Sequence, residues 1–136
     1  MRAECQCGDL AADIAADIAA AAEQVVACHC LACQKRSGSP FGVIAYFDGA
    51  DVTLSGRSSA FTRTGTSGKP FTSHFCPRCG TTVWVRSGGK PDAIGIPVGL
   101  FADPAFPAPI RSVWEETRHH WVAIPGAIAH FPRGRT

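Results

Sequence analysis

The sequence has few charged residues and no block of one sign. Charged residues make up 18% of the 136 residues, and the formal net charge is +2. No run of Lys or Arg occurs, so the basic surface typical of a nucleic-acid-binding protein is missing. The most apolar stretch, residues 10–26, is interrupted by Asp13, Asp17 and Glu23 and cannot span a bilayer. We therefore expect neither nucleic acid nor a membrane as a partner.

The chain also lacks the marks of an exported protein. It begins Met1-Arg2-Ala3-Glu4-Cys5 and shows no apolar signal core, so we expect a cytoplasmic location. The seven cysteines are an odd number, whereas a secreted disulfide scaffold usually has an even one. Each cysteine has another within two or three positions, which in a reducing compartment indicates metal or redox chemistry.

Familiar catalytic motifs are absent as well. The sequence has no nucleophile elbow, no phosphate-binding loop and no HExxH pair, so its only visible chemistry is that of metals and thiolates. The length suits one domain, residues 1–136. A domain of this size buries roughly two-thirds of its unfolded surface and needs no metal merely to form a core.

Short apolar or β-branched runs between turn signals predict a mainly β fold. The runs cover residues 41–47, 52–54, 60–63, 71–75, 81–85 and 93–98. A short helical turn is expected to end at Gly38, because glycine is the common residue just after a helix.

Residues 9–26 allow two interpretations. Leu10, Ile14, Ile18 and Ala22 recur every four residues in an Ala-rich segment, which favours a helix. Alternation around Leu10 and Ile14 also permits a strand. Near the C-terminus, Trp114 and Trp121 lie among charged residues and histidines. We expect the two tryptophans to seal the core, and a pocket-lining role is the alternative.

Two cysteine pairs together form a candidate structural metal site. Cys5 and Cys7 are two positions apart, so in an extended strand both sulfurs face the same side. Cys76 and Cys79 form a C-P-x-C-G knuckle, in which Gly80 permits a tight turn. Four sulfurs are the closed ligand set of structural zinc. Iron is the rival metal, since such a knuckle also suits rubredoxin-type iron, and buried free cysteines are the alternative without metal.

Cys28, Cys30 and Cys33 form a second, local cluster with no fourth cysteine left over. Three protein ligands leave one position for water or substrate, as in catalytic zinc. His29 is a candidate fourth ligand, but in an extended stretch it points away from its two neighbours, which favours a packing role. A second structural site and an empty site remain the alternatives.

Several segments resemble the family of glutathione-dependent formaldehyde-activating enzymes, which includes centromere protein V. These segments are Cys5-Gln-Cys7-Gly8, Cys28-His29-Cys30-Leu31-Ala32-Cys33-Gln34-Lys35-Arg36-Ser37-Gly38, residues 41–47, Phe75-Cys76-Pro77-Arg78-Cys79-Gly80-Thr81 and residues 128–132. The resemblance implies a small, mostly antiparallel, zinc-binding β domain of the Mss4-like type. It therefore also implies strands, and not a helix, in residues 9–26.

The resemblance also implies metals and chemistry. It assigns Cys5, Cys7, Cys76 and Cys79 to a structural zinc, and Cys28, Cys30 and Cys33 to a second, catalytic zinc, the division that the spacing itself favours. The implied activity is that of a carbon–sulfur lyase or synthase acting on S-(hydroxymethyl)glutathione, with glutathione as co-substrate. Held by only three thiolates, the second zinc is expected to be the more labile one.

Two features bear on that activity. A free thiol has a pKa of about 8.5, whereas a zinc-bound thiol is deprotonated. Three thiolates already load the zinc with negative charge, however, so a fourth is expected to bind weakly. Lys35, Arg36 and Arg63 are candidates to bind the carboxylates of glutathione, with solvated surface charge as the alternative for each. Ser73-His74 stand where many family members have a basic residue.

Two other functions are compatible with these residues. In one, the two zincs stabilise a non-enzymatic module that binds a partner. In the other, the Cys28 cluster serves as a thiol or metal sensor.

Overall fold

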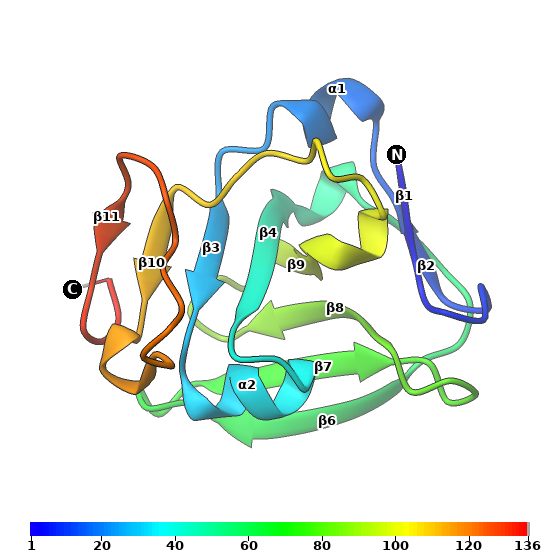
Figure 1. Ribbon diagram of the computed structural model, residues 1–136. Helices are drawn as coiled ribbons and strands as arrows, with labels where there is room; N and C mark the ends of the chain where they lie inside the picture. Colours follow the sequence, from blue (N-terminus) through cyan, green and yellow to red (C-terminus); the bar gives the residue numbers. More distant parts are fainter. Residues whose placement is uncertain (136) are drawn as a thin grey trace.

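The computed structural model describes residues 1–135, which form two β-sheets and several short helices (Figure 1). The smaller sheet has the order β1-β2-β5, with β1 at Arg2–Glu4, β2 at Ala11–Asp13 and β5 at Thr53–Ser55. The larger sheet has the order β11-β10-β3-β4-β9-β8-β7-β6. Its strands are β3 (Val25–Cys28), β4 (Gly42–Asp48), β6 (Ser59–Thr64), β7 (Pro70–Phe75), β8 (Thr82–Ser87), β9 (Ala93–Pro97), β10 (Arg111–Val113) and β11 (Ala129–His130).

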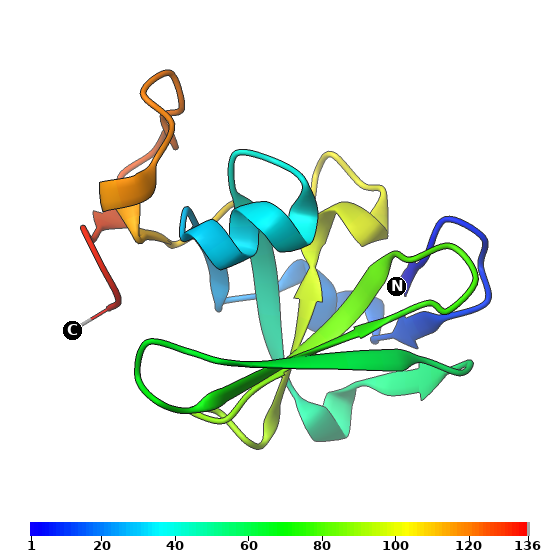
Figure 2. The same cartoon turned by 90° about the horizontal axis from the view of Figure 1, so that it is seen from below.

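The larger sheet is strongly twisted, so that β6, β7 and β8 cross the direction of β3, β4 and β10 (Figures 1 and 2). Most neighbouring strands pair antiparallel, while β3, β10 and β11 pair parallel. The predicted mainly β fold is confirmed. Each of the six predicted runs overlaps an observed strand, and the ends agree to within two residues.

The core lies between the two sheets. Buried residues from both sheets meet there, among them Ala3, Val25, Val83 and Ile96, together with Leu10 just before β2. Along β1, β3 and β8 the buried side chains alternate with more exposed ones, which is the pattern of a sheet packed on one face.

Five helical segments connect the strands. They are α1 (Ala16–Ala20), α2 (Leu31–Ser37) and the 3₁₀ turns Gly49–Asp51, Val98–Phe101 and Glu115–Thr117. Helix α2 ends at Gly38, whose φ of +65° is the left-handed conformation that glycine adopts readily, as expected. In residues 1–135 we find no helix that is both long and apolar enough to span a bilayer.

The expectation of strands throughout residues 9–26 is wrong for the middle of that segment. β2 and the start of β3 are strands, but Ala16–Ala20 form helix α1. Alanine has the highest helix propensity, and Ala19 is fully buried against the core, so propensity and packing agree over this turn.

The expectation that two tryptophans seal the core is also wrong. Trp121 is 66% exposed, and the adjacent Val122 is buried in its place. Trp114 is partly buried and lines a pocket. Backbone hydrogen bonds from residues 114–116 to residues 131–133 hold Trp114 at the edge of the larger sheet and not in the core.

Candidate metal centres

The four-sulfur cluster joins two turns that are distant in sequence. Cys5 and Cys7 lie in the turn after β1, and Cys76 and Cys79 in the turn between β7 and β8. The Sγ atoms of Cys5 and Cys7 are 3.6 Å apart, as are those of Cys7 and Cys76, and all four lie within 4.8 Å of one another. Sulfurs bound tetrahedrally to zinc at about 2.3 Å lie about 3.8 Å apart. The arrangement therefore fits such an ion.

Hydrogen bonds to sulfur support this cluster. The backbone N–H groups of Leu10 and Arg78 donate to the sulfurs of Cys5 and Cys76 at 3.3 and 3.4 Å. Thr81 Oγ1 lies 3.3 Å from the Cys79 sulfur, and this contact lowers the pKa of the Cys79 thiol to about 5. Such donors favour thiolates, which are the metal-binding form of cysteine.

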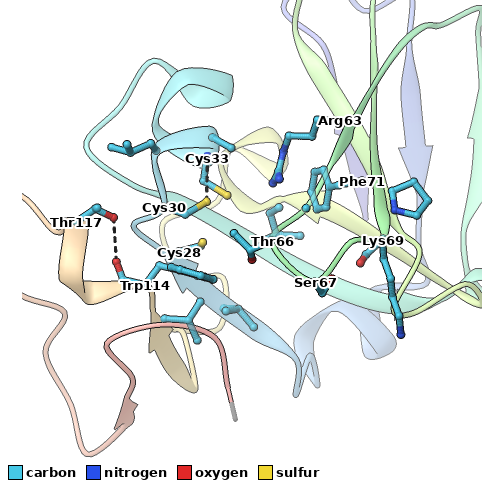
Figure 3. A pocket seen from close by; sticks show the side chains of 18 of the residues that line it. Cys28, Cys30, Cys33, Arg63, Thr66, Ser67, Lys69, Phe71, Trp114 and Thr117 are labelled. Carbon is cyan, nitrogen blue, oxygen red and sulfur yellow. Dashed lines mark hydrogen bonds between the residues drawn. The ribbon is translucent and has the colours of Figure 1, made fainter.

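The three-sulfur cluster is built from one short segment. Cys28 is the last residue of β3, Cys30 caps the start of α2, and Cys33 lies in the first turn of that helix. Their sulfurs lie within 4.8 Å of one another, and the Cys33 N–H donates to the Cys30 sulfur at 3.3 Å. Figure 3 shows the three cysteine side chains close together, between Trp114 and Thr117 on one side and Arg63, Phe71 and Lys69 on the other. We refer to Cys28, Cys30 and Cys33 as the triad.

The triad thiols compete for negative charge. Hydrogen bonds with Cys28 and Cys33 lower the pKa of the Cys30 thiol to about 2, and the charge of Arg63 acts in the same direction. The same interaction with Cys30 raises the pKa of Cys28. Three thiolates at this separation repel one another, so full ionisation requires a bound cation. The donor set therefore fits a divalent metal.

His29, which lies between Cys28 and Cys30, is held in place by hydrogen bonds of its ring and its carbonyl oxygen. Its ring is fully buried and its Nε2 lies 2.8 Å from Ser112 Oγ on β10, while burial lowers the pKa of the imidazole. Its carbonyl oxygen accepts hydrogen bonds from Thr117 Oγ1 at 2.8 Å and Gln34 Nε2 at 2.9 Å. His29 is not among the described residues whose ligand atoms gather at the triad, in agreement with a packing role.

The triad opens into a pocket of about 510 Å³. One wall is the β6–β7 hairpin with Arg63, Lys69 and Phe71, and the opposite wall holds Trp114 and Thr117 (Figure 3). Apolar side chains of β3 and β4 contribute as well. A concave, largely apolar site of this volume with a few polar groups is typical of a small-molecule site.

The structure ranks the three basic candidates. Arg63 lines the pocket, and its guanidinium carbon lies 4.5 Å from the centre of the Phe71 ring. Lys35 is exposed, and neither Lys35 nor Arg36 is among the described residues that line the pocket. His74 stacks on Trp84 at 3.6 Å between ring centres, and it too lies outside this lining set.

Sequence reasoning missed several lining residues. Lys69, Phe71 and Glu116 were not singled out, and neither was Tyr46, the only tyrosine in the sequence. Burial raises the pKa of Tyr46 to about 12. The available signal was register, since Arg63 and Phe71 are cross-strand partners on either side of the turn at Gly65–Lys69.

Comparisons with known proteins bear on the resemblance. Residues 1–117 match the family model described as glutathione-dependent formaldehyde-activating enzyme. A crystal structure of a Rhodobacter sphaeroides protein matches with a TM-score of 0.55 at 17% identity, covering 96% of this chain and 99% of that one, which shows the fold alone. No curated protein matches the chain. The family match ends before residues 128–132, so the suggested likeness of that segment lies outside it. Both cysteine clusters of the chain fall within the match, which covers most of the sequence. The chain therefore belongs to the glutathione-dependent formaldehyde-activating enzyme family.

Proposed function

We propose that the protein is a zinc-dependent carbon–sulfur lyase or synthase in the cytoplasm, acting on a glutathione–aldehyde adduct such as S-(hydroxymethyl)glutathione. The observation that carries the proposal is the triad, whose three clustered sulfurs open into a pocket of about 510 Å³. We assign the triad to a catalytic zinc. The cluster of Cys5, Cys7, Cys76 and Cys79 is assigned to a structural zinc.

The chain's residues divide the work. When bound, the zinc would keep the substrate sulfur in its thiolate form at neutral pH. The three cysteines of the triad line the pocket and would hold the zinc where a thiol in the pocket could reach it, and Arg63 would offer its guanidinium to a carboxylate of that thiol. In the synthase direction the thiol proton passes to water, the sulfur bonds to the aldehyde carbon, and the carbonyl oxygen takes the freed electron pair and a proton from water. The lyase direction reverses each step.

Thiol binding tests the proposal directly. Cobalt-substituted protein is titrated with glutathione up to the millimolar range, well above typical KM values of micromolar to millimolar. We expect the ligand-field spectrum to change, and S-methylglutathione, which lacks a free thiol, to leave it unchanged. Cys30→Ala should abolish both this response and turnover of thiol–aldehyde adducts followed by NMR. An unchanged wild-type spectrum would remove the case for a glutathione enzyme and favour a non-enzymatic module.

Arg63→Gln tests the carboxylate anchor. A charge-assisted hydrogen bond is worth about 1.5–3 kcal/mol, so we expect glutathione binding to weaken at least about tenfold. Binding of 2-mercaptoethanol, which has no carboxylate, should stay unchanged. Lys35→Gln is the matched control, because Lys35 is exposed and outside the lining set. Equal weakening of both thiols in Arg63→Gln would assign Arg63 a different role.

A further inference from the structure

Arg36 on α2 is partly buried, and two of its three guanidinium nitrogens have no hydrogen-bond partner among the described residues. Its Nε and Nη2 atoms are buried, and neither makes a hydrogen bond within residues 1–135. These two nitrogens form one edge of the planar guanidinium, the edge suited to pair with an anion. Burying a charge is costly unless an opposite charge lies nearby. The ion pairs found among the described residues do not include Arg36.

The neighbourhood of Gly42 shows what Arg36 faces. A Cβ atom built on Gly42 would lie 2.5 Å from Arg36 Nη2 and 3.6 Å from Cys33 Cβ. The guanidinium of Arg36 and the side chain of Cys33 therefore both lie next to Gly42, in the space that a larger side chain at this position would occupy. Gly42 is also the cross-strand partner of Cys28, so two triad residues adjoin this point. Since Arg36 is not among the described lining residues, it approaches the triad from outside the pocket.

The net charge expected for a metal-loaded triad explains why a positively charged side chain beside it would be favourable. Three thiolates and one divalent metal carry a net charge of one negative unit, and an incoming thiolate makes it two. Negative charge on the centre disfavours binding of that fourth thiolate. A fixed positive charge next to Cys33 would offset one unit of this negative charge and so favour both metal retention and thiolate binding.

We infer that Arg36 is a positioning residue whose partly buried guanidinium is the fixed counter-charge of the metal–thiolate centre at the triad, and that Gly42 keeps the space this guanidinium occupies. The part of the inference that concerns thiol binding rests on the proposed function. The part that concerns metal retention does not.

Metal release tests the inference without any turnover. Cobalt- or zinc-loaded protein is mixed with a chelator, and the fast phase of release is assigned to the triad by its loss in Cys33→Ala. We expect Arg36→Gln to accelerate this phase about tenfold, because unit charges interact strongly at short range in a partly buried site. The slow phase should not change. Arg36→Lys, which keeps the charge, should restore most of the retention, and Lys35→Gln should behave as the wild type.

Gly42→Ala provides a second route that leaves the charge on the chain. Its methyl group would displace the guanidinium, so we expect faster release in the same direction as in Arg36→Gln. This variant also decides the matter if Arg36→Gln fails to fold. A fast phase unchanged in folded Arg36→Gln, or in Gly42→Ala, would overturn the inference.

Thiol titration separates this inference from the proposed function. Arg36→Gln should weaken glutathione and 2-mercaptoethanol alike, whereas Arg63→Gln should weaken glutathione alone. If the wild type binds no thiol, the proposed function fails, and the release experiment still decides the role of Arg36. If the wild type binds thiols and Arg36→Gln binds both thiols as tightly as the wild type does, the inference fails while the proposed function stands.

Discussion

The two cysteine clusters use similar short motifs but differ in how the chain reaches them. The four-sulfur cluster joins turns that are far apart, with Cys7 and Cys76 separated by 69 positions. The triad comes from one segment, with Cys28 at the end of β3 and Cys33 in the first turn of α2. A metal in the first site restrains a long stretch of chain, whereas a metal in the second restrains a strand and helix already fixed by the sheet. The second site is therefore free to leave one position open to a ligand.

The largest expected difference is in stability. A cross-link that closes a loop of this length contributes about 4 kcal/mol. We expect Cys79→Ala to lose at least that much in free energy of unfolding, or to be insoluble, while Cys33→Ala folds and loses only about 1–2 kcal/mol. Urea denaturation of both variants gives the comparison. Equal losses would mean that the two clusters share the structural role.

Chelation should separate the clusters next. Elemental analysis should show up to two zincs per chain, and a red protein with iron–thiolate absorbance would contradict zinc.

A mild chelator should remove one equivalent of metal first, with little change in the thermal unfolding midpoint. Alkylation followed by peptide mass spectrometry should then label Cys28, Cys30 and Cys33 before the other four cysteines. Early labelling of Cys76 or Cys79 would reverse the predicted order.

The outer hydrogen bonds give a smaller and site-specific effect. Thr117 Oγ1 supports the triad through the carbonyl of His29, and Thr81 Oγ1 contacts the Cys79 sulfur. Loss of such outer partners typically reduces metal affinity about tenfold or more. We expect Thr117→Val to weaken only the triad and Thr81→Val only the four-sulfur site, as measured by chelator competition. Crossed effects would show that the two centres are coupled.

The smallest effects on stability are expected from substitutions of Trp114 and Trp121. Trp121 is 66% exposed, so Trp121→Phe should change stability by less than about 0.5 kcal/mol. Trp114 lines the pocket, so a fluorescence change on glutathione binding should disappear in Trp114→Phe and persist in Trp121→Phe. Persistence in both variants would place the bound thiol away from this wall.

The sequence was most informative where local pattern and tertiary packing agree. Strand β4 follows from an apolar run before a turn signal, the end of helix α2 from the glycine at position 38, and the grouping of the seven sulfurs from their spacing. The helix at Ala16–Ala20 agrees with the high helix propensity of alanine but not with the strands that the family resemblance implies for residues 9–26. The parallel pairing of β10 with β3 joins distant segments and leaves no local signal.

The roles of the basic residues were beyond sequence reasoning for a different reason. Lys35 and Arg36 are neighbours on one helix, yet the first is exposed and the second has buried nitrogens. The difference arises because Arg36 lies against Gly42 on the facing strand, where the missing side chain leaves room. Which helical residue meets a glycine of another element depends on how the two elements pack.

One wall of the pocket depends on the last residues that the structure describes. The N–H groups of Trp114, Glu115 and Glu116 donate to the carbonyl oxygens of Arg133, Phe131 and Pro132 at 2.8, 3.1 and 3.1 Å. The family match, however, ends at Thr117. The cysteine loops thus belong to the part of the chain that the family match covers, while the residues that support one wall of the pocket lie outside it. Divergence of the tail can therefore reshape that wall, and with it the form of the pocket, while both cysteine clusters stay intact.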